Sequence, residues 1–326
     1  FPTRRSSDLL KCHEPACFLA ALLNSLPMGF YSASQLVQDA RRHGVRVLPI
    51  DVTVSDIDCT LEGEPEPLRP ARGLGAPPLP QPAVRLGLRM VSSLHADAAK
   101  RLLQARATGP AFASTEDLAL RAQLSQQDLQ ALAAADALAS LSGHRRQQMW
   151  DAAAQHSAPP LWRNVPVHEA PLQLPEAPEG EEILFDYAAT GLTLRRHPLA
   201  LLRPRLARWR LQTALQLHSV AHGRKVRACG IVTVRQRPGT AKGTMFVTLE
   251  DETGPVNVIV WPAMVDVWRN ALLRSQLLAV EGVWQCSPGA LGSKAMVRHL
   301  VAQRFKDLTP LLGRMAQALQ GSRDFN

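Results

Sequence analysis

The sequence predicts a multidomain α+β protein in which two helical segments precede a small β-barrel. Apolar residues follow helical spacing up to about residue 155 and change to strand-like alternation after residue 225. Proline-rich stretches at 62–82 and 158–182 separate the chain into three pieces. With 326 residues and a hydrophobic composition of 46%, the chain is long enough to form two or three domains.

The composition favours a polyanionic partner in a reducing compartment. A net charge of +9 is typical of proteins that bind nucleic acid. The five cysteines are odd in number and scattered, which predicts reduced thiols and a cytoplasmic location. No run of 18 apolar residues is present, so no membrane contact is predicted. Cys12, His13 and Cys17 lie close together, but no second ligand pair follows at a usual zinc spacing, so no metal site is predicted.

The first nine residues have a separate explanation. The peptide FPTRRSSDL resembles the translation of a common sequencing-library adaptor, and no apolar stretch follows it as a secretory signal would require. We therefore expect residues 1–9 to be an artefact that stands outside the fold, and the chain to be a truncated product.

Residues 10–62 form the first predicted domain. Apolar spacing indicates helices at Pro15–Asn24 and Ser34–His43, followed by a strand at Val45–Val52. The proline-rich residues 63–83 are then expected to form an extended, poorly packed linker.

Residues 84–157 are predicted to be helical and to contain two helix-hairpin-helix units. The expected helices are Ala96–Ala107, Thr115–Arg121, Ser125–Ala135 and Gly143–Gln155. In such a unit, a tight turn brings the amides of a helix N-terminus to a DNA phosphate, and nearby cations add charge without reading sequence. The alternative is an ordinary helical bundle with solvated arginines.

Each hairpin supplies candidate DNA-binding residues. Those of the first are Ser92, Ser93, His95 and Lys100, and those of the second are Gly143, His144, Arg145 and Arg146. Such hairpins usually carry glycines where this chain has Ser93, His95 and Asp136. The second hairpin, which keeps Gly143 beside two arginines, is therefore the better candidate for phosphate contact.

Residues 223–309 are predicted to form an OB-fold. The expected strands are Val226–Arg237, Thr244–Asp251, Val256–Trp261, Leu277–Gln285 and Val297–Phe305, with a helix at 262–275. Three strands, a helix and two strands are the element order of this oligonucleotide-binding barrel. Residues 158–222 are interpreted as a linker with connecting helices, and residues 310–326 as a tail.

Basic and aromatic residues of the barrel indicate single-strand binding. Arg235, Arg237 and Lys242 cluster around the first turn, while Phe246 and Trp261 lie on or beside neighbouring strands. Cations that follow a phosphate backbone and aromatic rings that stack on bases are what such binding needs. The alternative places both aromatic residues in the barrel core, where Trp268 and Trp284 are also expected.

No catalytic residue or cofactor is predicted within the chain. No D-x-D motif for two-metal phosphoryl transfer lies on a predicted strand, and Glu250, Asp251 and Glu252 are interpreted as a solvated acidic turn. The chain also lacks a P-loop, a G-x-S-x-G motif and an H-E-x-x-H motif.

Several segments together resemble the bacterial C-family DNA polymerases. LKCHEPA (10–16), residues 24–45 and PIDVTVSDIDCTLE (49–62) resemble the end of their fingers region, and residues 84–94 and 132–150 resemble their tandem helix-hairpin-helix region. Residues 187–203, residues 230–262 and the closing SRDF (322–325) are similar to the error-prone, DnaE-type members. The resemblance identifies a C-terminal fragment: the end of the fingers, the tandem hairpins and then the OB-fold.

This resemblance implies the function of the parent protein. Such a parent is a DNA-directed DNA polymerase, a nucleotidyltransferase that requires Mg²⁺ at palm-domain carboxylates outside this fragment. It would act in translesion synthesis during damage-induced mutagenesis, with a sliding clamp, an inactive Y-family-like partner and a RecA-like accessory protein. The fragment would bind template–primer duplex and single-stranded DNA.

Two other functions remain open from the sequence. The chain could be a stand-alone, non-enzymatic module that binds single-stranded DNA. The OB-fold could also be the anticodon-binding domain of an aminoacyl-tRNA synthetase, but no synthetase motif accompanies it.

Overall fold

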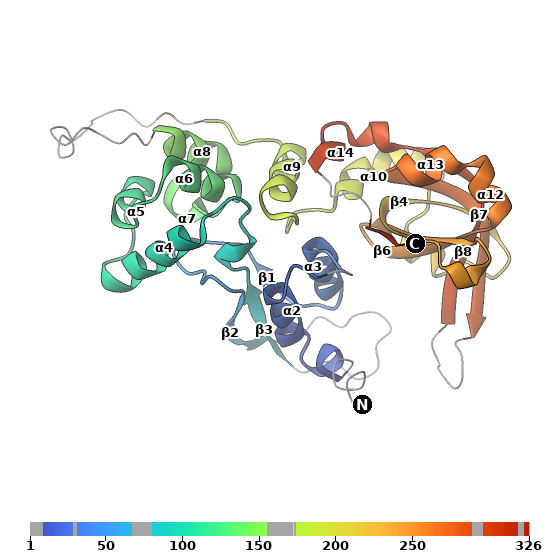
Figure 1. Cartoon of the computed structure of the whole chain (residues 1–326), viewed down its shortest axis with the longest axis horizontal. Coiled ribbons are helices and arrows are strands. Elements are labelled where there is room, and N and C mark those ends of the chain that lie inside the picture. Colours follow the sequence, from blue (N-terminus) through green and yellow to red (C-terminus); the bar gives the residue numbers. More distant parts are fainter. Residues whose placement is uncertain are drawn as a thin grey trace. The chain divides into compact units, whose positions relative to one another are not determined.

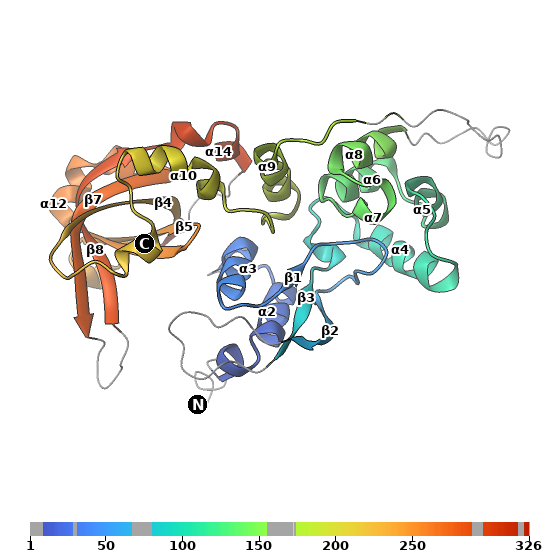
Figure 2. The same cartoon turned by 180° about the vertical axis from the view of Figure 1, so that it is seen from behind.

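The structure, a computed structural model, describes residues 9–28, 31–66, 80–154, 172, 174–288, 296–318 and 323–325. The adaptor-like residues 1–8 and the middle of each proline-rich connector lie outside the described residues. The chain forms two compact units, Phe1–Leu194 and Arg195–Asn326 (Figures 1 and 2).

The first unit begins with two helices and a small sheet. The helices are α2 (Pro15–Asn24) and α3 (Ala33–Arg42), and the strands are β1 (Val47–Leu48), β2 (Thr60–Glu66) and β3 (Gln81–Arg85). The central strand β3 pairs parallel with β1 and antiparallel with β2. Both predicted helices are confirmed.

Two predictions for this region need correction. The predicted strand Val45–Val52 shortens to β1, because Pro49 has no amide hydrogen to continue the ladder. The ends of the predicted linker are not loosely packed, because they form β2 and β3. The side chain of Gln81, only 3% exposed, accepts the Ala16 amide at 3.3 Å and thereby ties β3 to α2.

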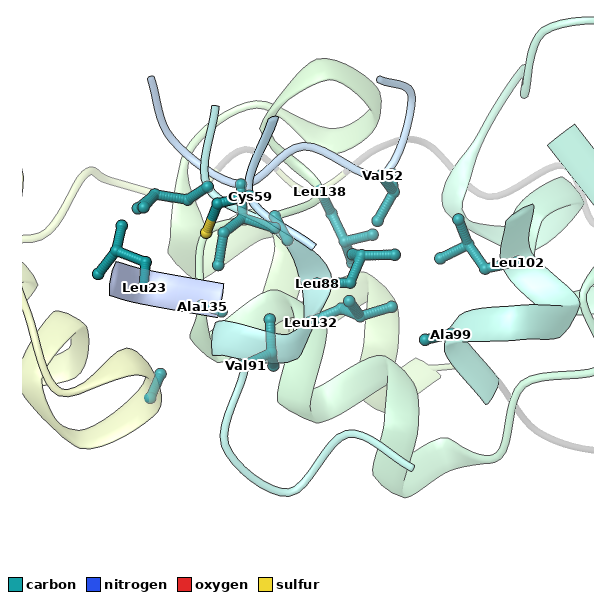
Figure 3. Packing of buried hydrophobic residues seen from close by; sticks show 14 of the residues in the cluster. Leu23, Val52, Cys59, Leu88, Val91, Ala99, Leu102, Leu132, Ala135 and Leu138 are labelled. Atoms are coloured by element: carbon teal, nitrogen blue, oxygen red, sulfur yellow. The ribbon is translucent and has the colours of Figure 1, made fainter. Parts of the chain in front are cut away.

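Helices complete the first unit. They are η1 (Leu88–Met90), α4 (Ala96–Thr108), α5 (Thr115–Arg121), α6 (Gln126–Ala134), α7 (Ala139–Ser142), α8 (Arg145–Ala154) and α9 (Glu179–Thr190). The Ser125 side chain and Asp128 form a capping box that starts α6. Leu88, Leu102, Leu132 and Leu138 pack in one apolar core with residues of α2 and the sheet region (Figure 3). The four helices predicted for residues 84–157 are confirmed to within two residues at each end.

The second unit is a closed five-stranded barrel with helices around it. Its strands are β4 (Lys225–Gln236), β5 (Met245–Asp251), β6 (Gly254–Val260), β7 (Leu277–Pro288) and β8 (Met296–Asp307). Its helical elements are α10 (Pro198–Arg208), α11 (Ala214–Leu217), η3 (Gly239–Ala241), α12 (Pro262–Val267), α13 (Arg269–Arg274), η4 (Thr309–Leu312) and α14 (Met315–Ala318). A short last strand, β9 (Arg323–Phe325), pairs parallel with β4.

The barrel closes because β4 is long enough to serve two neighbours. It pairs with β7 along residues 225–231 and with β5 along residues 231–236, and β6 pairs parallel with β8. At the crossover lies Gly230, where an added Cβ would sit 2.8 Å from the Glu250 amide nitrogen. Glycine therefore allows the close approach that closes the barrel.

The helix between β6 and β7 differs from its prediction. A single helix was expected at 262–275, but the chain forms α12 and α13 with a break at Trp268, whose ψ of 21° is not helical. Trp268 packs against the barrel core, where its ring centroid lies 6.1 Å from that of Phe305. Trp284 is 2% exposed within the same core. The core position predicted for Trp284 is confirmed, whereas Trp268 is partly buried against that core.

Candidate nucleic-acid interface

The first hairpin turn joins η1 to α4 and contains three predicted contact residues. Ser92, Ser93 and His95 are all exposed. Ser93 has a φ of +66°, in the left-handed region that favours glycine. The Ser92 amide donates to the Ala189 carbonyl of α9 at 2.7 Å. That amide is therefore occupied within the protein and cannot donate to a phosphate in this arrangement.

His95 links the first hairpin to the start of α6. Its Nδ1 lies 2.8 Å from Oδ1 of the buried Asp128. Burial raises the pKa of Asp128, but hydrogen bonds from Ser125 and His95 outweigh burial and hold that pKa below its ordinary value. Lys100 is exposed, and its ion-pair partner among the described residues is the exposed Asp97, at 3.1 Å. Such a surface pair is weak, so Lys100 is available to a phosphate.

The second hairpin turn is held by one buried side chain. Asp136 and Gly143 both have left-handed backbones, with φ values of +60° and +72°. Gln148 donates to Asp136 Oδ1 at 2.7 Å and to the Gly143 carbonyl at 2.6 Å, and it accepts the Leu138 amide at 3.1 Å. An added Cβ at Gly143 would meet no atom within 4 Å, so glycine is favoured there by φ alone.

Arg145 does not face solvent, which corrects its predicted role as a phosphate contact. The side chain is 2% exposed and donates to the Glu182 carbonyl at 2.8 Å. It also pairs with the carboxylates of Glu182 at 3.2 Å, Asp136 at 3.7 Å and Asp186. These carboxylates neutralise the guanidinium, so Arg145 holds α9 against the hairpin and has no free face for DNA.

Arg146 and His144 keep partial access to solvent. Arg146 pairs with Glu181 of α9 at 2.8 Å, and its side chain is 36% exposed. The His144 side chain is half-buried. The first amides of α8 and of α4 have no partner within their helices, as at every helix N-terminus. The contacts that both hairpins offer to a phosphate are therefore mainly backbone amides, with Lys100 and Arg146 beside them.

The β5–β6 wall of the barrel exposes the predicted aromatic residues. Met245, Val247 and Leu249 point into the core, whereas Phe246 between them is 38% exposed. Trp261, which follows β6, is 53% exposed. The alternative that placed both rings in the core is therefore excluded, and their stacking on bases stays a prediction.

Cations near this wall divide into exposed and buried groups. Arg237 and Lys242 are exposed around the β4–β5 turn. Arg235 is 6% exposed and donates to the carbonyls of Leu272 and Ser275. The expected DNA contact of Arg235 is therefore wrong, because its side chain ties β4 to the end of α13.

The sequence did not indicate two polar residues of the same wall. Asn257 on β6 is exposed and lies opposite Thr248 of β5, with Thr248 Oγ1 3.3 Å from Asn257 Oδ1. Both face outward beside Phe246, because their positions alternate with the core residues. Their alternation in the strands was the available signal, but only the aromatic and basic residues were singled out.

The acidic turn between β5 and β6 is structural. Asp251 is 2% exposed and accepts the amides of Ala214, Thr253 and Gly254 at 2.7, 2.7 and 3.0 Å. Arg203 of α10 donates to both carboxylate oxygens of Glu252. The interpretation as a solvated turn is therefore wrong.

Among the described residues, no group of three His, Cys, Asp or Glu side chains is placed to hold a metal ion. No described helix is long and apolar enough to cross a membrane.

Two family matches agree with this geometry. Residues 44–148 match the helix-hairpin-helix motif family, and residues 226–308 match the OB-fold nucleic acid binding domain family. The predicted fold class is thus confirmed: an α+β chain in which a helix-hairpin-helix region precedes an OB-fold barrel.

Curated relatives match almost the whole chain. The error-prone DNA polymerase of Ralstonia nicotianae is 53% identical over 325 residues, which cover 98% of this chain and 28% of the relative. Those of Bordetella parapertussis and Methylococcus capsulatus are 52% and 50% identical over 98% of this chain, and it covers 29% and 30% of them. This chain therefore spans less than a third of each of these relatives.

One solved structure is similar at a much lower level. Asparaginyl-tRNA synthetase from Pyrococcus horikoshii matches 30% of this chain and 22% of its own at 20% identity, with a TM-score of 0.25. A likeness this weak supports no conclusion about function.

Proposed function

We propose that this chain, which is similar over 98% of its length to bacterial error-prone DNA polymerases, is the C-terminal DNA-binding part of such an enzyme. The resemblance inferred from sequence segments is confirmed by these relatives. The observation that carries the proposal is the succession, in one chain, of a helix-hairpin-helix region and an OB barrel with two exposed aromatic rings.

The two regions would bind different parts of a template–primer. The N-terminal amides of α4 and α8, with Lys100 and Arg146, would hold phosphates of the duplex without reading its sequence. Phe246 and Trp261 would stack on bases of the single strand, and Arg237 and Lys242 would neutralise its phosphates. The chain would thus hold both the copied duplex and the template strand ahead of it.

The chemistry would belong to the rest of the enzyme. The proposal includes nucleotidyl transfer that uses Mg²⁺ at palm-domain carboxylates, none of which is assigned to this chain. It also includes translesion synthesis during damage-induced mutagenesis, with a sliding clamp and accessory mutagenesis proteins, in the bacterial cytoplasm. The family resemblance supports these points.

DNA affinity measured against salt tests the binding role. Fluorescence anisotropy of the full chain with labelled single-stranded and duplex oligonucleotides should show affinity that falls as salt rises, because bound phosphates release counterions. Replacement of Phe246 and Trp261 by alanine should weaken single-strand binding by roughly 10-fold or more per ring. Trp150→Ala, at an exposed tryptophan of α8, is the matched control. The proposal would be contradicted if single-strand affinity did not change with salt and was the same in the double variant as in the unchanged chain.

A stand-alone single-strand-binding module is the second candidate, and the exposed barrel wall alone would support it. The genomic sequence upstream of the codon for Leu10 separates the two. A reading frame that continues into palm carboxylates is expected. A start codon at that point would instead favour the stand-alone module.

A further inference from the structure

Two neighbouring cavities on the barrel wall away from β5 and β6 together form a hollow. A cavity of about 570 Å³ lies between the end of α10 and strands β7 and β8, and Trp268 and Phe305 are among its lining residues. A neighbouring cavity of about 550 Å³ shares Arg210 and Arg227 with it. In the barrel, β7 lies between β4 and β8, so this wall does not include β5 or β6. The hollow is therefore separate from the wall that carries Phe246.

The lining of the hollow is strongly basic. Its six cations are Arg208, Arg210, Lys225, Arg227, Arg304 and Lys306, and its one carboxylate is Glu281. Glu281 is neutralised by Arg227 at 2.8 Å. Within the described part of the chain, no carboxylate lies within 4.0 Å of the charged groups of the other five cations, which are all exposed. These side chains contrast with Arg145 and Arg235, which bind groups of the protein itself.

The Trp209 ring contacts two cations, Arg205 and Lys306. Its indole is 38% exposed. Lys306 Nζ lies 5.3 Å from the ring centroid, and the Arg205 guanidinium lies 5.7 Å from it. The ring attracts each cation through its quadrupole but does not cancel the charge. Trp209 therefore holds positive groups in place while leaving them free to bind an anion.

The backbone at the edge of the hollow is strained. Helix α10 ends with the Arg210 amide donating to the Ala207 carbonyl at 2.9 Å. Arg210 then has a φ of +57°, in the left-handed position that usually carries glycine after a helix. Strain of this kind is often retained where a side chain serves a function. Here the retained side chain is a guanidinium that lines both cavities.

We infer that this hollow is a second binding site for single-stranded DNA on the barrel, with phosphates at Arg208, Arg210, Arg304 and Lys306. The inference rests on the proposed DNA-binding function and extends it to a wall that had no assigned role. Six cations against one carboxylate match a polyanion with regularly spaced charges. A concave site with aromatic residues suits a flexible strand better than the stiff, convex backbone of a duplex.

The test compares two triple variants of the full chain. The first replaces Arg208, Arg304 and Lys306 by glutamine. The second likewise replaces Arg269, Arg274 and Arg314 by glutamine; these arginines are exposed and do not line the hollow. Both variants therefore lose the same net charge. Affinities for oligothymidines of about 6 and about 30 nucleotides are then measured against salt, since one OB-fold covers roughly 4–16 nucleotides.

The long strand should distinguish the variants. We expect the hollow variant to bind the long strand at least 10-fold more weakly than the control variant. The plot of log affinity against log salt concentration should also be less steep by about 2, because each lost phosphate contact removes about 0.7 from the slope. Binding of the short strand, which the β5–β6 wall can hold alone, should match the control. Equal long-strand affinities of the two triple variants, or an equal loss for duplex DNA, would overturn the inference.

Two further measurements keep the outcome interpretable. Circular dichroism should show that the hollow variant is folded, and Arg208→Lys with Arg304→Lys should retain most of the long-strand affinity because the charge is kept. Replacement of Phe246 and Trp261 by alanine separates the two proposals. If only that variant loses affinity, the hollow is refuted while the binding function stands; if neither variant loses affinity, both fail.

Discussion

Among the described residues, several arginines of the helical unit bind carboxylates or carbonyls of the protein, whereas a cluster of cations in the barrel unit has no carboxylate partner. In the first, arginines bind the protein itself: Arg85 forms two bonds with Glu62, Arg106 donates to the carbonyls of Val52 and Ser55, and Arg145 is enclosed by carboxylates. In the barrel unit, Arg208, Arg210, Arg304 and Lys306 line an open hollow. A net charge of +9 therefore does not show which cations meet DNA. The acceptors already present around each cation decide that.

The largest expected effect is the loss of Arg145. Arg145→Ala should lower the free energy of unfolding of the helical unit by about 3–5 kcal/mol, because it leaves buried carboxylates without their counter-charge. Urea unfolding followed by circular dichroism measures this loss. Arg146→Ala, which removes a half-exposed partner of Glu181, is the control and should cost no more than about 1 kcal/mol. Similar, small effects of both variants would show that Arg145 is not a structural cation.

A smaller effect is expected at Asp128, and it should depend on pH. The pKa of this carboxyl is lowered in the fold, so its contribution to stability is present above the ordinary value of 3.8 and is lost as pH falls through the lower folded value. Asp128→Asn should therefore cost about 1–2 kcal/mol at neutral pH. The difference from wild type should shrink toward about pH 3. A difference that is the same at both pH values would contradict this assignment.

The smallest effects should separate the two hairpin turns. Ser93→Gly should stabilise the fold by about 0.5 kcal/mol, because relief of the left-handed backbone slightly exceeds the entropy cost of glycine. Asp136→Gly gains the same relief but loses the bond to Gln148 and a carboxylate beside Arg145. It should destabilise by about 0.5–1 kcal/mol. Thermal unfolding should show a stability change of opposite sign in the two variants. Changes of the same sign would contradict the proposed role of Asp136.

Local signals predicted most of the fold. The capping box at Ser125 and the alternation around Phe246 depend on neighbours in the chain, and both α6 and β5 formed as expected. The burial of Arg145 depends on Asp186, which is 41 positions away in the sequence. Asp136 lies near Arg145 in the sequence, but Glu182 and Asp186 belong to α9, within the segment 158–222 that is interpreted from the sequence as a linker with connecting helices, so neither was indicated as a partner.

The basic hollow could not be predicted from the sequence for the same reason, because its residues are distant in the chain. Trp209 and Lys306 lie far apart in the sequence, and only the barrel brings the end of α10 to β8. The prediction of an OB-fold directed attention to β5 and β6, which form the usual binding wall. A cation becomes a candidate contact only when its partners are known, and pairing over such separations is not visible in a single sequence.

Hydrogen exchange with and without DNA tests the central contrast most directly. With a saturating oligothymidine of about 30 nucleotides, peptides from 245–261 and from 204–211 should gain protection, while 145–154 of α8 should be unchanged, since single-strand binding orders the barrel surface. Protection confined to α8, with none in the barrel, would contradict both the barrel as the single-strand-binding region and the structural role of Arg145.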